Sequence, residues 1–294
     1  MQSIPTKTLA NGFSLPVYGL GTWQMGGRHE SDDTHDEQEV TAIRQAIDYG
    51  ITHIDTAESY GMGHSEELVG KAITGYDRSK LFITSKVSAH NQRYDDLLQS
   101  CAASLKRLDT EYLDLYLLHR YPEPGIPIAE TVRAMNQLMS EGKIKHIGVC
   151  NFTVPMLEEI KKYTSHPIVC NQVHYSLRCR EIVDKGILEY CQANDIMVVA
   201  WGPLEKAMLE KNWLLEKLAT KYGKTPYQVA LNWLISQPDV VTIPKTSQLK
   251  HLEENLGALG WHLSEADMAD LTDNFPDQTV LSDRVPLEYV VDLP

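Results

Sequence analysis

Short apolar segments alternate along this chain with longer segments whose apolar residues recur at helical spacing. Eight short apolar runs have the length and composition of strands: 17–21, 51–55, 81–86, 113–119, 146–151, 168–173, 196–201 and 240–244. A helical pattern follows each run, and Val40, Ile43 and Ile47 mark the first of them. Strands that alternate with helices predict a parallel sheet. Eight such units in roughly 250 residues predict a closed (β/α)₈ barrel, the TIM barrel of the α/β class.

Four segments lie outside these eight units. The dipeptide Asn11-Gly12 predicts a short hairpin over 7–17 with a type I′ turn. Apolar spacing predicts two extra helices, over 212–222 and 264–273. From Asn274 to Pro294 the chain has little periodicity and three prolines, which predicts a tail lying over one end of the barrel, the rim where the strands end. No linker-like composition separates the units, so residues 1–294 are expected to form one domain.

Two serines stand where helices are expected to begin. Ser65 precedes Glu66 and Glu67, an arrangement that predicts an N-terminal cap followed by acids that complement the helix dipole. Ser264 stands three residues before Asp267 and predicts a similar start.

A doubly wound open sheet is the rival fold for alternating strands and helices. It would lead us to expect a glycine-rich dinucleotide fingerprint after an early strand. Gly19, Gly21, Gly26 and Gly27 have the wrong spacing for that fingerprint and lead into an acidic loop. The pattern therefore favours the closed barrel.

Composition narrows the function classes. The net charge of −13 argues against a broad surface for nucleic acid or for an anionic membrane. The five cysteines include no CxxC pair, which favours reduced thiols and no zinc site. No apolar run approaches the ~18 residues of a membrane span, and the first residues lack the layout of a signal peptide. We therefore expect a cytoplasmic protein without a nucleic-acid or membrane surface.

Polar or aromatic side chains close most of the predicted strands: Asp55, Lys86, His119, Asn151, Gln172, Trp201 and Lys245. In a parallel barrel these strand ends meet at one rim, which is where active sites of this fold lie. Each residue taken singly is explained as well by capping or by packing at the edge of the core. Charged groups that converge on one rim must pair or carry a large desolvation cost, so the set as a whole predicts a functional site.

Tyr60 follows Asp55 by five residues and supplies a phenol to this rim. A free phenol titrates near ~10, too high for an efficient proton donor at neutral pH. An ammonium such as that of Lys86 favours the phenolate and lowers this pKa, while a carboxylate such as Asp55 keeps the ammonium charged. His119 adds a donor that can orient a carbonyl oxygen. These four residues suit proton delivery during the reduction of a carbonyl group.

Such a reduction needs a hydride from a cofactor. Asn151 and Gln172 can hydrogen-bond a carboxamide, and Trp201 offers a flat face for a nicotinamide ring. The segment from Ile243 to Ser247, with His251, Glu254 and Asn255 after it, offers cations, hydroxyls and amides for a ribose phosphate. Capping of strand ends by Asn151 and Gln172 remains a competing interpretation.

From about Thr8 to Pro286 the chain resembles the aldo-keto reductase superfamily. The segments that carry the resemblance are Gly19-Leu-Gly-Thr-Trp23, Asp55-Thr-Ala-Glu-Ser-Tyr60-Gly61, Phe82-Ile-Thr-Ser-Lys86, Leu113-Asp-Leu-Tyr-Leu-Leu-His119, Ile147-Gly-Val-Cys-Asn-Phe152, Asn171-Gln-Val-His-Tyr175 and Ile243-Pro-Lys245. The resemblance implies a barrel enzyme that reduces aldehydes and ketones with NADPH, and a hairpin that plugs the bottom of the barrel.

The resemblance also implies roles for individual residues. Tyr60 would be the general acid, Lys86 and Asp55 its tuning pair, and His119 the residue that orients the carbonyl. Residues implied for the cofactor are Thr22, Trp23, Asp55, Asn151, Gln172, Trp201, Gly202, Leu204, Ile243, Lys245, Thr246, Ser247, His251, Glu254 and Asn255. Residues implied for a small carbonyl substrate are Trp23, Tyr60, His119 and Tyr121.

Two departures from the family pattern bear on the cofactor. Cys150 stands where relatives often have Ser before the asparagine, which weakens or removes one carboxamide hydrogen bond. His251 stands where relatives often have the arginine that binds the adenosine phosphate. NADPH is the expected cofactor, and use of NADH stays open.

Other functions also stay open. They are a cofactor-binding regulatory protein on the same barrel, like the β-subunits of potassium channels, and a lyase or isomerase that uses Lys86 as a Schiff base. A monomer is expected from the family, and the overall pattern most resembles microbial reductases of small aldehydes, 2-oxoaldehydes and diketo-sugar acids.

Overall fold

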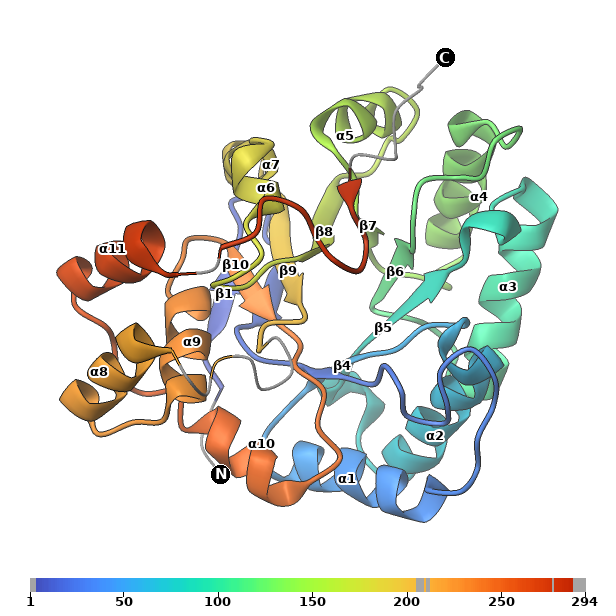
Figure 1. Cartoon of the computed structure of the whole chain (residues 1–294). Coiled ribbons are helices and arrows are strands. Elements are labelled where there is room, and N and C mark those ends of the chain that lie inside the picture. Colours follow the sequence, from blue (N-terminus) through green and yellow to red (C-terminus); the bar gives the residue numbers. More distant parts are fainter. Residues whose placement is uncertain (1–3, 205–208, 210–211, 277, 288–294) are drawn as a thin grey trace.

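The computed structural model describes residues 4–204, 209, 212–276 and 278–287. Eight parallel strands form one sheet in sequence order. Their bounds are Leu20–Gly21 (β3), His53–Asp55 (β4), Phe82–Val87 (β5), Leu115–Leu118 (β6), Ile147–Cys150 (β7), Ile168–His174 (β8), Met197–Trp201 (β9) and Val240–Thr242 (β10). Helices surround the sheet (Figure 1).

The helices are Asp36–Asp48 (α1), His64–Ile73 (α2), Tyr94–Arg107 (α3), Ile128–Ser140 (α4), Val154–Lys161 (α5), Glu181–Asp184 (α6), Ile187–Ala193 (α7), Trp213–Tyr222 (α8), Pro226–Ile235 (α9), Leu249–Leu256 (α10) and Glu265–Asn274 (α11). Every predicted strand is present, with bounds shifted by a few residues at most. The predicted (β/α)₈ barrel is confirmed.

The last strand meets the first through the segment just before β3. Tyr18 and Thr242 form a parallel bridge. The Gly19 N–H donates to the Thr242 carbonyl at 2.8 Å, and the Thr242 N–H donates to the Val17 carbonyl at 3.0 Å. These bonds close the sheet and leave no open edge at this junction.

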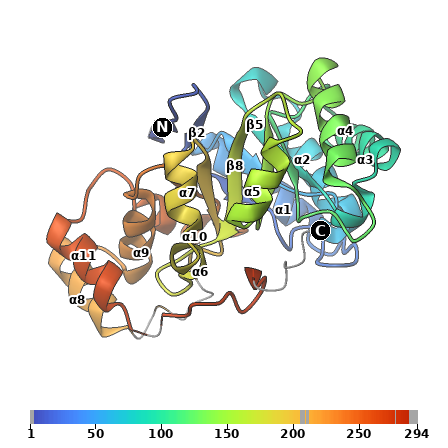
Figure 2. The same ribbon diagram turned by 90° about the horizontal axis from the view of Figure 1, so that it is seen from above.

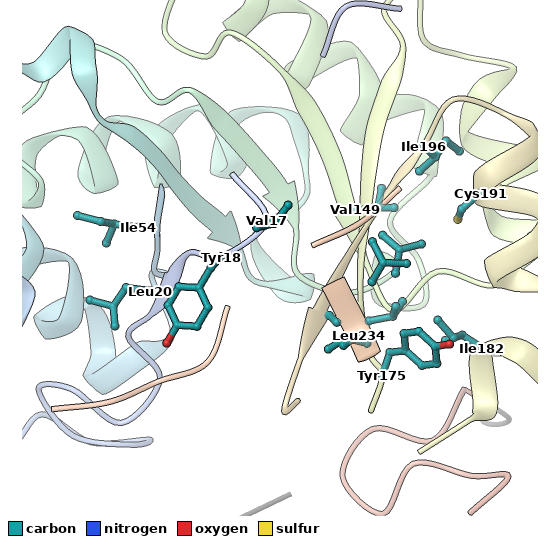
Figure 3. Packing of buried hydrophobic residues seen from close by; sticks show 14 of the residues in the cluster. Val17, Tyr18, Leu20, Ile54, Val149, Tyr175, Ile182, Cys191, Ile196 and Leu234 are labelled. Atoms are coloured by element: carbon teal, nitrogen blue, oxygen red, sulfur yellow. The ribbon is translucent and has the colours of Figure 1, made fainter. Parts of the chain in front are cut away.

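Side chains alternate between the inside of the barrel and the layer under the helices, as the two-residue period of a strand requires. On β6, Leu115 and Leu117 belong to the interior cluster, while Tyr116 and Leu118 belong to the outer one. Figure 3 shows part of the outer cluster, in which residues from strands and helices pack together: Val17, Tyr18, Leu20, Ile54, Val149, Tyr175, Ile182, Cys191, Ile196 and Leu234.

The N-terminal hairpin closes the amino end of the barrel. Its strands, Thr6–Thr8 (β1) and Ser14–Pro16 (β2), are antiparallel. Leu9, Phe13 and Leu15 are buried in the same cluster as the interior side chains of the strands. The predicted plug is therefore confirmed, and it covers apolar surface that would otherwise face water.

The turn of this hairpin differs from the prediction. A type I′ turn needs positive φ at both central residues, but Gly12 (φ 88°) has it and Asn11 does not. The Leu9 N–H donates to the Phe13 carbonyl at 2.9 Å, which makes a three-residue loop. The side-chain oxygen of Asn11 accepts from the Phe13 N–H at 2.9 Å, and this bond holds Asn11 at negative φ. The predicted type I′ turn was wrong.

The predicted cap at Ser65 was also wrong. Helix α2 begins one residue earlier and follows Gly63, which has positive φ. Ser65 is fully buried, and its hydroxyl donates to the Thr22 hydroxyl at 2.8 Å. Glu66 is buried as well and forms an ion pair with Arg107 at 2.6 Å. Ser65 and Glu66, which the local pattern assigned to the start of the helix, thus form contacts with residues distant in the sequence.

The two extra helices predicted outside the barrel repeat are confirmed as α8 and α11. They lie side by side at one end of the molecule (Figure 2). Lys221 of α8 forms a 2.7 Å ion pair with Asp267 of α11. The Ser264 hydroxyl accepts from the Asp267 N–H at 3.2 Å, so the predicted cap on α11 is present.

The described part of the C-terminal tail is attached to the barrel through Glu181. This buried carboxylate accepts from the backbone N–H groups of Ser282 (2.9 Å) and Leu287 (2.7 Å). The Ser282 hydroxyl lies 2.7 Å from Nδ1 of His174, at the end of β8. That the whole tail covers the rim remains a prediction, because residues 277 and 288–294 lie outside the described residues.

Among the described residues, no helix combines the length and the apolar character needed to cross a bilayer.

We expect Glu181→Ala to loosen this attachment, because two buried tail amides would lose a charged acceptor. Amide hydrogen exchange over 278–287, followed by mass spectrometry, should become at least about tenfold faster. Glu189→Ala on the exposed side of α7 is the matched control and should leave exchange unchanged. Equal exchange in the Glu181 variant and the wild type would show that the tail is held by other contacts.

Candidate active site

A cavity of about 760 Å³ lies at the carboxyl ends of the strands. Eleven of the predicted site residues line it: Trp23, Asp55, Tyr60, His119, Asn151, Gln172, Trp201, Gly202, Leu204, Ile243 and Lys245. They come from opposite sides of the barrel and from positions far apart in the sequence. The convergence predicted from the strand ends is therefore present in the fold.

Lys86 lies beneath this cavity with no exposed surface. Its ammonium donates to Asp55 Oδ1 at 2.5 Å, to the Thr56 carbonyl at 2.8 Å and to the Tyr60 hydroxyl at 3.1 Å. An ammonium has three donors, and all three are used. Adjacent strands produce this cluster, because Asp55 ends β4 and Lys86 lies near the end of β5.

Burial and charge act in opposite directions on these groups. Burial by itself lowers the pKa of Lys86. The Asp55 carboxylate and the Tyr60 phenol raise it by more than burial lowers it, so the pKa lies above its ordinary value. Burial raises the pKa of Tyr60 to about 12, and the nearby Lys86 only partly offsets this rise. The predicted lowering of the Tyr60 pKa below its ordinary value was therefore wrong for this structure, because desolvation outweighs the ammonium.

The loop after Tyr60 has a left-handed backbone that fixes the direction of the phenol. Gly61 (φ 55°), Met62 (φ 56°) and Gly63 (φ 94°) all have positive φ. A Cβ at Gly61 would lie 2.1 Å from the Gly26 carbonyl, so only glycine fits there. The Trp23 ring packs edge-on against Tyr60 with centroids 4.9 Å apart.

His119 follows β6, and its ring lies 5.7 Å from the Tyr60 ring between centroids. Burial, with smaller effects of Lys86 and Arg120, holds the pKa of His119 well below its ordinary value. The ring is therefore neutral at neutral pH. The Ser59 hydroxyl lies 3.3 Å from Nδ1, and when it donates there the ring proton is on Nε2.

Asn151, Gln172 and Trp201 form one wall of the cavity and already bond to protein groups. The Trp201 N–H donates to Asn151 Oδ1 at 3.3 Å. Gln172 Nε2 donates to Asp55 Oδ2 at 2.7 Å. One face of the Trp201 indole stacks on His174, with centroids 4.2 Å apart and planes 7° apart. Within the described residues, the Asn151 amide nitrogen and the Gln172 carbonyl oxygen make no other side-chain bond and can meet a ligand, and Trp201 lines the cavity beside them.

The sequence matches the aldo/keto reductase family over residues 18–274. This match covers most of the barrel and includes every strand that contributes to the cavity. The chain belongs to the aldo/keto reductase family.

Named relatives agree with this assignment. Methylglyoxal reductase YeaE of Escherichia coli (strain K12) is 38% identical over 269 residues, which cover 90% of this chain and 92% of the relative. A thermostable aldo-keto reductase, Tm1743, solved with the inhibitor epalrestat, is 46% identical with a TM-score of 0.88 and coverages of 91% and 98%. An aldo-keto reductase of Klebsiella pneumoniae, solved with NADPH, is 36% identical with a TM-score of 0.83 and coverages of 92% and 96%.

Several residues predicted for the cofactor of this aldo/keto reductase lie away from the cavity. Thr22 is buried behind it, and its hydroxyl donates to the Asp55 carbonyl at 3.0 Å. The Thr246 hydroxyl donates to the Gln248 carbonyl at 3.1 Å. Asn255 is buried, and its amide donates to the Tyr18 hydroxyl at 3.2 Å.

The remaining predicted residues lie nearer the surface. His251 is exposed and Glu254 is half-buried, both on α10. Ser247 lines a neighbouring hollow that it shares with Lys245. Tyr121 is not among the lining residues, and its ring packs against Phe152 with centroids 5.5 Å apart.

Other lining residues were not predicted from the sequence. Arg120 directly follows His119, and Ser59 directly precedes Tyr60, so each could have been found by extending the analysis by one residue. Arg284 and Val285 come from the C-terminal tail, which we expected to lie over the rim, although neither residue was named. Among the described residues, no group of three or more His, Cys, Asp or Glu side chains is arranged to hold a metal ion.

Removing the carboxylate of Asp55 should destabilise the fold, because it leaves a buried ammonium without its counter-charge. We expect Asp55→Asn to lower the free energy of unfolding in urea by about 3 kcal/mol or more. The double variant Asp55→Asn, Lys86→Met should recover part of the loss, because it removes the unpaired charge as well. Asp270→Asn, in the surface pair with Lys217, is the control and should change stability little. A double variant less stable than Asp55→Asn alone would contradict this account.

Proposed function

We propose that this protein reduces aldehydes and ketones to alcohols with NADPH, and that Tyr60 is the general acid. The observation that carries the proposal is the buried Lys86 ammonium, bonded to both Asp55 and Tyr60 directly beneath a cavity. The relatives support it, since one is named a methylglyoxal reductase and another was solved with NADPH.

The chemistry of the cavity wall fits a nicotinamide cofactor. The free face of Trp201 is a flat surface for the ring, and the Asn151 nitrogen and Gln172 oxygen match the oxygen and nitrogen of a carboxamide. Gly202 has positive φ and lines the cavity without a side chain. When bound, NADPH supplies the hydride that reduces the carbonyl carbon.

Tyr60 supplies the proton. Because its pKa is about 12, the phenol is protonated at neutral pH and can donate to the developing alkoxide, which is a much stronger base. The phenolate that remains lies beside the Lys86 ammonium, 3.1 Å from the oxygen. Asp55 keeps that ammonium charged, so the pair stabilises the product of proton transfer more than the starting phenol.

His119 orients the substrate. Because the ring is neutral, it donates one N–H and does not compete with Tyr60 as an acid. With Ser59 donating to Nδ1, the Nε2 proton is directed to the carbonyl oxygen. Two donors, one from Tyr60 and one from His119, then hold the oxygen in place.

Lys245 supports the choice of NADPH. It is the only lysine or arginine that lines both the main cavity and the neighbouring hollow, as far as the described residues show. Its ammonium is 3.4 Å from the Ser247 hydroxyl, and no ion pair among the described residues includes it. We assign Lys245, with Thr246, to the adenosine 2′-phosphate, and Glu254, with Asn255, to the adenine; Ser247 and His251 stay candidates for the same part of the cofactor.

Two alternative functions predict other results when turnover is measured with NADPH and with NADH. Comparable rates with NADPH and NADH would favour an enzyme of relaxed cofactor choice, with His251 in place of an arginine. Cofactor binding without turnover of any aldehyde would favour the regulatory function. The monomeric state and the cytoplasmic location remain predictions.

We expect Tyr60→Phe to lower kcat/KM for methylglyoxal by at least about 100-fold, because the proton donor is lost. NADPH binding, followed by tryptophan fluorescence, should change little, because the phenol is not part of the wall that receives the cofactor. Tyr163→Phe is the matched control, because Tyr163 is exposed just after α5 and its hydroxyl donates to Glu159, outside the cavity. Wild-type turnover in the Tyr60 variant would show that another group is the acid.

We expect Lys245→Gln to raise KM for NADPH by at least about tenfold and to leave KM for NADH nearly unchanged. The reason is that only NADPH carries the additional phosphate. Lys250→Gln, an exposed neighbour on α10, is the control. An equal rise in KM for NADPH and for NADH would show that the adenosine phosphate does not bind at Lys245.

A further inference from the structure

Arg120 is a cation at the cavity to which the proposed reaction gives no role. It directly follows His119 and lines the same cavity. Its side chain is exposed, and no ion pair among the described residues includes it. Arg107, by contrast, is half-buried and forms an ion pair with the buried Glu66, which gives it a structural role.

Arg120 and Lys245 lie on opposite sides of the cavity. Arg120 follows β6 and Lys245 follows β10, and these strands are four apart in the eight-stranded barrel. Among the residues proposed to contact the cofactor, Trp201 ends β9, the neighbour of β10, and Gly202 and Leu204 follow it. The other two, Asn151 after β7 and Gln172 on β8, are neutral amides proposed for a neutral carboxamide. The proposed cofactor wall therefore does not need the charge of Arg120.

The charges around the cavity favour an anion near Arg120. Asp55 is committed to Lys86, which leaves Glu123 as the other carboxylate among the lining residues. Arg284 adds a second guanidinium from the tail, next to Gly202. The chain as a whole carries a net charge of −13 and repels anions, so an anionic substrate needs local cations at the site of binding.

We propose that Arg120 determines substrate specificity by binding a carboxylate of the substrate, so that the preferred carbonyl compounds are oxo acids and aldehyde acids. This proposal rests on the proposed function, because it places the reacting carbonyl at Tyr60 and His119. A guanidinium binds a carboxylate through two parallel hydrogen bonds, which fixes the orientation of the carbonyl as well as adding affinity.

The effect of Arg120 on His119 agrees with this role. The positive charge of Arg120 helps to hold the pKa of His119 low. Burial and Lys86 also lower this pKa, burial most of all, so the ring can stay neutral when a bound carboxylate offsets the charge of Arg120.

The test compares an anionic and a neutral substrate, para-formylbenzoate and its methyl ester, which differ in charge and by one methyl group, with NADPH as cofactor. We expect the wild-type protein to have a higher kcat/KM for the acid than for the ester. Arg120→Gln should lower the acid-to-ester ratio at least about tenfold and leave the ester rate nearly unchanged. Arg120→Lys should keep part of the preference, because it keeps the charge without the bidentate geometry.

The matched control is Arg133→Gln, an exposed arginine on α4 that lies against Tyr94 and outside the cavity. It changes the net charge equally, so an equal fall in the ratio would indicate a general field effect and overturn the proposal. An unchanged ratio in Arg120→Gln, or an equal loss with both substrates, would overturn it as well. If the wild type reduces the ester while the Arg120 proposal fails, the proposed carbonyl reduction still stands. If the wild type reduces neither substrate, both the proposed function and the role of Arg120 are contradicted.

Discussion

The ion pair between Lys86 and Asp55 is the interaction on which the rest of the site depends. A fully buried ammonium is tolerated only if all its protons are bonded, and here Asp55, Thr56 and Tyr60 receive them. The second oxygen of Asp55 accepts from Gln172 on the far side of the barrel. One buried charge therefore links the general-acid candidate to the wall proposed for the cofactor.

Desolvation shifts the pKa values of Tyr60 and His119 more than any single neighbouring charge does. It raises the pKa of Tyr60 although an ammonium is 3.1 Å away, and it keeps His119 neutral. Both groups thus present protons without carrying charge in the free protein. The ammonium then acts mainly on the phenolate, where its stabilisation favours the transition state over the ground state.

The cations in and beneath the cavity differ in burial and in position. Lys86 is internal and paired, whereas Lys245 and Arg120 lie at the surface on opposite sides. In an acidic chain, Lys245 and Arg120 place positive charge where anionic parts of ligands are proposed to bind. The tail adds Arg284 and Val285 to the same cavity through its attachment at Glu181.

The sequence by itself determined the barrel, the plug, the two extra helices and the strand-end residues that line the cavity. Strand and helix periods are local, and a parallel barrel brings its strand ends to one rim. Only the tertiary structure decided the three-residue loop at Asn11, the burial of Ser65, the raised pKa of Tyr60 and the position of Arg284 at the cavity. Each of these depends on desolvation or on hydrogen bonds between residues distant in sequence, which no local pattern encodes.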